Sequence, residues 1–209
     1  MSAADPDAFY RDRVPAHWNR TVDAQERAAE GDAEARRLLD EMQRVRGTID
    51  VVVTGGPTAR RYHLNIRAGR MSADAEPVRA PFLVLVHDLD TFATLERESG
   101  DSVLGFLGAL AGQAGEMKLT ATRLQNLLAL SGSARLELTG GAPMTLVAHF
   151  GPETEQDGPH CSLRIPSDTY AALRAGELAP QEAFLGGQVE IEGDMQLAMQ
   201  LALAALAPE

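Results

Sequence analysis

The chain has 209 residues, of which 44% are hydrophobic, and a formal net charge of −11 at pH 7. This acidic balance argues against nucleic acid as a partner, because phosphates are bound through clustered Lys and Arg, and it disfavours unaided adsorption to anionic membranes. No apolar run reaches the roughly 18 residues that a membrane-spanning helix needs, so we expect a globular protein with at most transient membrane contact.

The first predicted element is a short amphipathic helix, or a pair of turns, around Pro15. Large apolar residues recur there at near-helical spacing and are expected to cover part of a core. They are Phe9, Tyr10, Val14 and Trp18. Residues 1–36 are therefore predicted to form a helical extension in front of the main fold.

The next elements predict a helix followed by three strands. Residues 33–47 carry apolar side chains on one face and end at Gly47, as an amphipathic helix does. The runs at 48–56 and 61–69 are strand-like and are separated by two glycines and a proline, which predicts a hairpin. The apolar run at 80–89 predicts a more buried strand.

Asp90 is expected to cap a helix at 91–99. His87 and Asp88 are neighbours in a predicted strand, so their side chains should diverge, and we assign no acid/base or metal site to them. The first half then closes with three further elements. They are a helical run at 102–112, a strand at 116–120 and a helix at 121–132.

The second half of the chain repeats this plan. DTFATL at 90–95 returns as DTYAAL at 168–173, an offset of 78 residues that also places Phe106 on Phe184. The offset is 85 upstream and 72 downstream, and offsets that change only in loops are typical of an internal duplication. The second set comprises strands at 135–140, 144–150 and 160–166, helices at 168–176 and 180–187, a strand at 188–194 and a helix at 195–207.

The repeated plan predicts an α+β fold made of two fused domains. Each copy has a mostly antiparallel sheet that is covered on one face by helices. We call residues 37–131 the first repeat and residues 122–209 the second repeat. Helix 122–131 closes the first and opens the second, so the copies are expected to share it and to pack together.

The second repeat carries a set of motifs in a fixed order between residues 167 and 206. These are a Ser-Asp helix start, a Pro-Gln-x-Ala-Phe turn, a glycine before an alternating strand, and Gly-Asp-Met before the last helix. The positions are Gly176, Leu178, Pro180, Gln181, Ala183, Phe184, Gly187, Val189, Ile191, Gly193, Asp194, Met195, Leu197, Ala198 and Met199. Together they resemble the sterol carrier protein type two domain family. The first repeat is related only through the duplication, because it reads LGALAGQAGEMKLTAT where the Pro-Gln and Gly-Asp signatures would stand.

The resemblance implies an apolar tunnel between the sheet and the last helix, which members of the family use to hold sterols, fatty acids or fatty acyl thioesters. It implies no catalytic residue and no cofactor. The last helix fits this role, since its methionines are flexible and polarisable and lie in one stripe with Leu203 and Leu206. We therefore predict non-catalytic lipid binding or carriage in the second repeat. The predicted lining residues are Leu146, Leu163, Tyr170, Phe184, Met195, Met199 and Leu203.

Two other functions stay open at this point. The duplicated fold could have packed its cavities shut and serve as an interaction module, either as a homodimer or as an accessory subunit of another enzyme. It could also be an enzyme that acts on a lipid-like substrate, although the sequence offers no acid/base pair for that chemistry.

The remaining reactive residues give weak signals. Cys161 is the only cysteine, which excludes an internal disulfide, and it is predicted to be a small buried hydrophobic residue. No Cys/His pair has zinc spacing, and the pair His149 and His160 alone is a poor metal site. The N-terminal MSAADPDAFYRDR lacks the apolar core of a secretory signal, so a cytoplasmic protein is expected.

Overall fold

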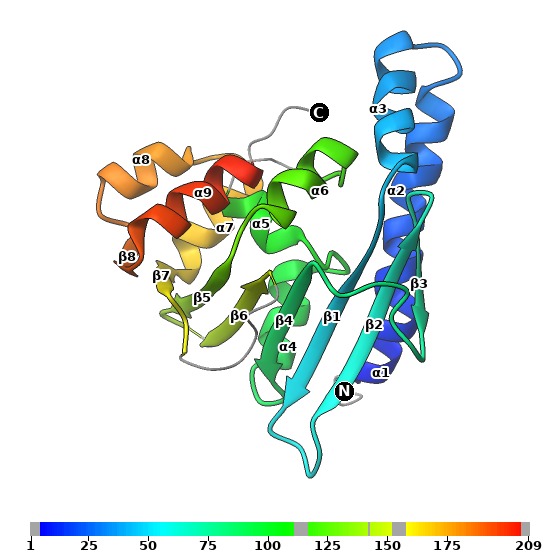
Figure 1. Ribbon diagram of the computed structural model, residues 1–209. Helices are drawn as coiled ribbons and strands as arrows, with labels where there is room; N and C mark the ends of the chain where they lie inside the picture. Colours follow the sequence, from blue (N-terminus) through cyan, green and yellow to red (C-terminus); the bar gives the residue numbers. More distant parts are fainter. Residues whose placement is uncertain (1–4, 111–116, 142, 152–157, 206–209) are drawn as a thin grey trace.

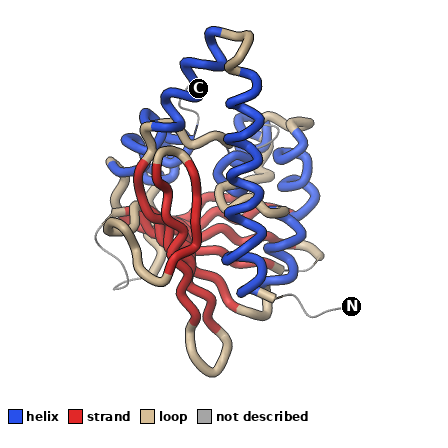
Figure 2. The backbone as a smooth tube through the Cα atoms, turned by 90° about the vertical axis from the view of Figure 1, so that its right-hand side faces the viewer, coloured by secondary structure: helices blue, strands red, loops and turns tan. Residues whose placement is uncertain are grey.

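The computed structural model describes residues 5–110, 117–141, 143–151 and 158–205. It shows one eight-stranded sheet with the strand order β3-β2-β1-β4-β6-β5-β7-β8, with helices packed against one face (Figures 1 and 2). The strands are β1 Arg46–Thr54, β2 Arg60–Arg67, β3 Arg70–Asp74, β4 Leu83–Asp88, β5 Gly132–Thr139, β6 Met144–Phe150, β7 Cys161–Pro166 and β8 Glu190–Gly193. Of the neighbouring strands in this order, β1 and β4 are parallel, β5 and β7 are parallel, and all other neighbours are antiparallel. The predicted α+β class is confirmed, and β4 and β6 join the two predicted sheets edge to edge.

The helical layer begins with a longer helical run, from Pro6 to Ala28, than the short helix or pair of turns expected around Pro15. The helices are α1 Pro6–Ala8, the π-helical turn η1 Phe9–Arg13, α2 Val14–Ala28, α3 Ala33–Gln43, α4 Phe92–Ser99, α5 Gly105–Leu110, α6 Ala121–Leu128, α7 Ser167–Ala175, α8 Pro180–Leu185 and α9 Met195–Ala205. Within the residues just delimited, none of these helices is long and apolar enough to cross a membrane.

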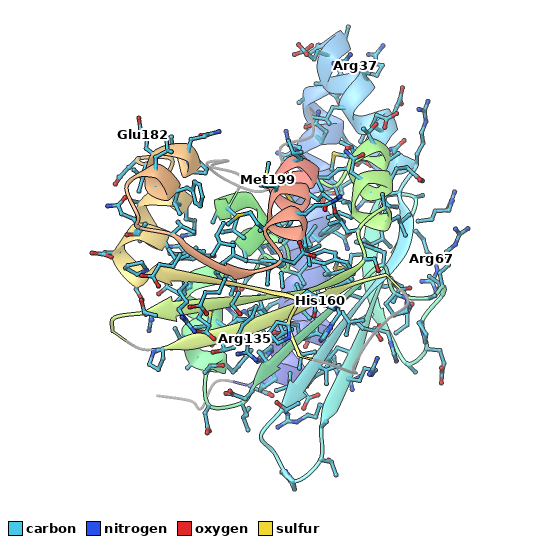
Figure 3. All side chains as sticks on the ribbon, turned by 60° about the vertical axis from the view of Figure 1, so that its left-hand side comes forward. Arg37, Arg67, Arg135, His160, Glu182 and Met199 are labelled. Carbon is cyan, nitrogen blue, oxygen red and sulfur yellow. The ribbon has the colours of Figure 1, made fainter. Side chains whose placement is uncertain are left out.

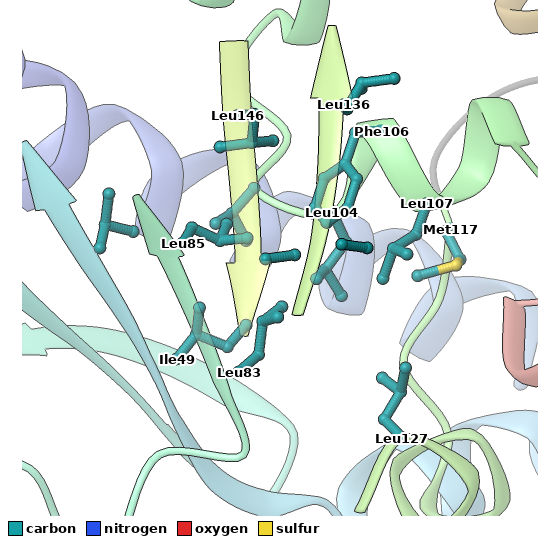
Figure 4. Close-up of a cluster of buried hydrophobic side chains, with 14 of the residues drawn as sticks. Ile49, Leu83, Leu85, Leu104, Phe106, Leu107, Met117, Leu127, Leu136 and Leu146 are labelled. Carbon is teal, nitrogen blue, oxygen red and sulfur yellow. The ribbon is translucent and has the colours of Figure 1, made fainter. Parts of the chain in front are cut away.

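Side-chain alternation along the strands explains why helices cover one face. Ile49 and Leu83 are fully buried and point with Leu85 toward the helices, where Leu104 and Leu107 meet them (Figure 4). Residues at alternate positions point to the other face, which carries mostly polar side chains on the second repeat. One continuous apolar core therefore lies between the sheet and the helical layer.

The two repeats pair their central strands in the same register. In the first repeat Ile49 of β1 is opposite Leu83 of β4, and in the second repeat Ala134 of β5 is opposite Cys161 of β7. These pairs are related by the offsets of 85 and 78 residues read from the sequence. The duplication stays a prediction, and this correspondence of register supports it.

Helix α6 packs against both α3 and α9. In the predicted plan α3 is the first helix of the first repeat and α9 is the last helix of the second. Helix α6 is both the last helix of the first repeat and the first helix of the second. Its contacts are those expected of a helix shared between the copies. The domain boundaries at 37–131 and 122–209 remain a prediction.

Three local predictions are wrong and one strand was missed. The helix expected at 33–47 ends at Gln43, and Gly47 lies inside β1. A strand was predicted at 116–120, but residues 117–120 are not in a strand, and Glu116 is outside the described residues. The reason is that β6 of the second repeat pairs with the edge of β4 where the predicted strand would lie. β3 was not predicted at all. The helix at 91–99 is not capped by Asp90: its N-cap residue is Thr91, which makes no side-chain capping hydrogen bond, and the Thr91 backbone N–H donates to Asp88 Oδ1 at 2.7 Å.

His87 is buried in the core of the first repeat and makes two hydrogen bonds. Its Nδ1 lies 2.9 Å from the Asp88 carbonyl oxygen, which can only accept, so Nδ1 donates there. Nε2 therefore accepts from the Tyr10 hydroxyl at 2.7 Å. Burial lowers the pKa of His87. The neutral imidazole is thus the form that the folded protein prefers.

We expect His87 to make the protein less stable at acidic pH. The unfolded imidazole has an ordinary pKa of about 6.5, so below that pH the unfolded state binds a proton that the folded state excludes. As the pH is lowered below about 6.5, this residue should reduce the free energy of unfolding by up to about 1.4 kcal/mol per pH unit. Urea unfolding at about pH 7.5 and pH 5.5 measures the loss. It should be smaller in His87→Gln than in the wild type, and equal losses would contradict the expectation.

Candidate functional site

An apolar cavity of about 570 Å³ lies on the helical side of the sheet, among α5, α7, α8 and α9. Its volume is in the range of small-molecule sites, about 300–1,000 Å³. Gln181 is the one polar side chain among its described lining residues. The others are Leu107, Leu110, Leu163, Leu173, Pro180, Phe184, Val189, Ile191, Met195, Ala198, Met199, Leu201 and Ala202. Figure 3 shows α9, with Met199, and α8, with Glu182, on this side of the sheet.

The cavity stays open because helix α8 buries little of its surface against the rest of the protein. Ala183 is its one fully buried residue, whereas Phe184 is 46% and Leu185 is 84% exposed. β8 pairs only with β7 at the edge of the sheet. Short elements at a sheet edge leave the apolar faces of α8 and α9 without a packed neighbour, and the space between them stays open.

The Gly-Asp-Met motif fixes where α9 begins. Gly193 has a φ of +88°, and a Cβ there would overlap the backbone carbonyl oxygen of His160. The same oxygen accepts from the Asp194 backbone N–H at 2.8 Å. Asp194 then caps α9, since its Oδ1 accepts from the Leu197 N–H at 3.0 Å. The close backbone approach permitted by glycine therefore places Met195 at the cavity wall.

The structure brings four of the predicted site residues together. Leu163, Phe184, Met195 and Met199 line the 570 Å³ cavity. Leu146 and Tyr170 instead line a separate cavity of about 30 Å³. Leu203 is 65% exposed and lines neither of these two cavities. Leu206 of the predicted stripe is outside the described residues.

Helix α9 packs on the core with a different face from the predicted stripe. The residues that face the core are at most 6% exposed, and they are Leu197, Ala198, Leu201 and Ala204. Met195 and Met199 are 43% and 60% exposed and lie at the edge of the cavity. Because α9 is apolar on both faces, its periodicity could not tell which face is buried.

The first repeat has a nearly closed counterpart of this cavity. Four lining residues have equivalents 78 positions earlier, and these equivalents line the cavity of about 30 Å³. The pairs are Leu163 with Leu85, Leu173 with Leu95, Gln181 with Val103, and Phe184 with Phe106. Phe106 is 6% exposed against 46% for Phe184, and Leu107 is fully buried against 84% exposure for Leu185. Equivalent side chains are therefore buried in the first repeat and exposed in the second.

A second cleft, of about 560 Å³, lies on the opposite face of the sheet. Its lining includes three arginines and two histidines, which are Arg60, Arg61, Arg135, His149 and His160. Each arginine pairs with a carboxylate, and the pairs are Arg60–Asp7 at 2.9 Å, Arg61–Asp50 at 2.8 Å and Arg135–Glu137 at 3.4 Å. The positive charge is therefore compensated within the protein, and the apolar cavity is the better candidate site.

Reactive chemistry is not evident near the cavity. Cys161 is buried, and burial raises the pKa of its thiol to about 11, which disfavours the nucleophilic thiolate. In the described part of the chain, no group of three or more His, Cys, Asp or Glu residues could hold a metal ion. The described lining of the cavity offers apolar surface and one amide, that of Gln181.

Most of the residues that line the cavity lie in a segment that matches a known protein family. Residues 116–205 match the SCP-2 sterol transfer family, and this segment contains every motif of the second repeat. The predicted resemblance of the second repeat to sterol carrier proteins is confirmed.

Two solved structures are similar at low sequence identity. One is sterol carrier protein 2 like 2 from Aedes aegypti, at 15% identity, covering 55% of this chain and 95% of that chain with a TM-score of 0.32. The other is the sterol carrier protein domain 2 of Helicoverpa armigera, at 15% identity, covering 100% of this chain and 98% of that chain with a TM-score of 0.21. No curated protein matches the chain.

Proposed function

We propose that this chain, whose residues 116–205 match the SCP-2 sterol transfer family, binds and carries a hydrophobic lipid in the cavity beside α9. The observation that carries the proposal is the 570 Å³ cavity with its almost wholly apolar lining. The proposed contact residues are Leu163, Phe184, Met195 and Met199. The proposed role is non-catalytic, because the described lining holds one amide, Gln181, and no acid/base pair.

Burial of an aliphatic chain is enough to give useful affinity. Each buried methylene contributes about 0.8 kcal/mol, so a chain of about 12 methylenes contributes on the order of 10 kcal/mol before association and ordering costs remove several. The remainder corresponds to micromolar binding. Apolar burial barely distinguishes one chain from another, so a fatty acid, an acyl thioester and a sterol-like molecule are all suitable ligands.

Delipidated protein is expected to bind one molecule of a fluorescent fatty acid with an affinity of about micromolar. Unlabelled oleic acid should displace it, because both occupy the same apolar space. Native mass spectrometry should show one added oleate per chain. A titration without saturation, or protein that carries no added lipid mass at excess oleate, would contradict the proposed function.

Exposed apolar residues beside the cavity favour a second candidate function. Leu185 and Leu203 are 84% and 65% exposed, and Leu128 on α6 is 50% exposed. Where exposed apolar residues form one patch, they often mark a protein interface. A homodimer or an accessory subunit would cover these residues. Sedimentation of the protein with and without oleic acid tests this function, since an interface role requires association that does not depend on the lipid.

A further inference from the structure

The small cavity lies between the two repeats, since Leu146 and Tyr170 line it together with residues of the first repeat, and it also takes side chains from the N-terminal extension. Phe9 and Tyr10 of η1 line it and are 1% and 3% exposed. They come from the helical extension before residue 37, outside the repeated plan. The Phe9 ring packs on Phe92 of α4 with 5.4 Å between the ring centroids. The extension therefore supplies two aromatic rings to the small cavity, whereas none of the described residues that line the larger cavity comes from the extension.

We infer that the first repeat retains a second site for an aliphatic ligand and that Phe9 and Tyr10 occupy it from within the chain. The equivalence of Leu85, Leu95 and Phe106 with lining residues of the larger cavity carries this inference. The class of ligand in this inference, an aliphatic molecule, is taken from the proposed function. Rings and an aliphatic chain both fill an apolar space at close packing, so one can replace the other.

The segment that carries the two rings is held at the surface by weak contacts. Arg13 pairs with Asp101 at 2.7 Å and Asp7 with Arg60 at 2.9 Å, and the Arg13 side chain is 47% exposed. Exposed ion pairs contribute little to stability. η1 is also a π-helical turn, a rare form that is frequent at functional sites. Beneath these ion pairs the Tyr10 hydroxyl donates to His87 Nε2 at 2.7 Å, and Val14, where α2 begins, is 1% exposed. The rings are therefore held within a packed core, and a change to them acts directly on the site.

The test removes the rings in the full chain after the larger cavity is closed. In an Ala202→Trp background, which narrows the cavity beside α9 and weakens binding there at least tenfold, the protein should carry almost no decanoic acid at a concentration near the wild-type dissociation constant. Adding Phe9→Ala and Tyr10→Ala should restore one bound decanoate per chain in native mass spectrometry, since an apolar cavity left by such deletions stays dry and accepts small apolar ligands. In the wild-type background the same double change should raise the count from one to two.

Two matched variants separate a specific site from a general loosening of the core. Phe9→Leu with Tyr10→Phe keeps most of the volume and should bind no decanoate in the Ala202→Trp background. Val22→Ala makes a gap under α2, at a residue that is 1% exposed and does not line the cavity, and it should bind none either.

Single removal of Phe9 keeps the test decisive if the double variant fails to fold. Phe9→Ala in the Ala202→Trp background should bind benzene, detected as an increase in the unfolding temperature. Folded variants that bind neither probe would overturn the inference. Absence of decanoate from the wild type would refute the proposed function alone, because binding by the ring-deleted variant is measured independently of the cavity beside α9.

Discussion

Ala202→Trp is expected to weaken fatty acid binding at least tenfold and to change the free energy of unfolding by less than about 1 kcal/mol. Ala202 lines the cavity from α9 and is partly exposed, so an indole at this position extends into open space and not into the packed core. Displacing two methylenes of the ligand already removes about 1.6 kcal/mol, which exceeds a factor of ten. Competition titration with the fluorescent fatty acid measures the affinity, and urea unfolding measures the stability.

Leu203→Trp is the matched control. It introduces the same side chain one residue later on the same helix, but Leu203 is 65% exposed and does not line the cavity. Its affinity should stay within about a factor of two of the wild type. Met199→Trp is a less decisive choice, because Met199 is 60% exposed and an indole there can turn toward water. Equal affinities for Ala202→Trp and Leu203→Trp would show that the ligand binds elsewhere.

The sequence predicts most of the strands of each repeat, but neither their order in the sheet nor the way the repeats join. The offset of 85 residues aligns Ile49 with Ala134, and the offset of 78 residues aligns Leu83 with Cys161. In the structure Ile49 pairs with Leu83 and Ala134 pairs with Cys161. The edge of β4 could not be predicted, because either residues 117–120 or β6 could have paired there and only tertiary packing selects β6. β3 was missed because Arg70–Asp74 is a short, mostly polar edge strand without an apolar alternation.

The site was predictable where a local motif fixes it and not where helix packing does. Phe184 and Met195 belong to the Pro-Gln-x-Ala-Phe and Gly-Asp-Met motifs, and both line the cavity. Tyr170 has helical periodicity that points it into the core, but which cavity it faces depends on α4 and η1. Leu107 and Leu110 were missed because they come from the first repeat and reach the cavity only through the packing of α5 against α7 and α9.

Gly193→Ala is expected to lower the free energy of unfolding by about 3 kcal/mol and to weaken lipid binding as well. Two costs combine at this residue. Alanine is strained at a φ of +88°, and its Cβ would overlap the His160 carbonyl oxygen, which also accepts the Asp194 N–H. Relief of the overlap requires the β8–α9 corner to move away from β7, which shifts Met195 at the cavity wall. Urea unfolding and the fluorescent titration measure the two effects.

Gly187→Ala separates the overlap from the strain of positive φ. Gly187 has a φ of +68°, but a Cβ there meets no atom within 4 Å. Its substitution should therefore cost only about 1 kcal/mol of backbone strain and leave the start of α9 in place. If both variants lose the same stability and keep the same affinity, the close approach of Gly193 to His160 does not position α9. If only Gly193→Ala loses affinity, the glycine of the Gly-Asp-Met motif acts on the site by allowing two backbone segments to touch, and Asp194 and Met195 then act from the position that this contact gives them.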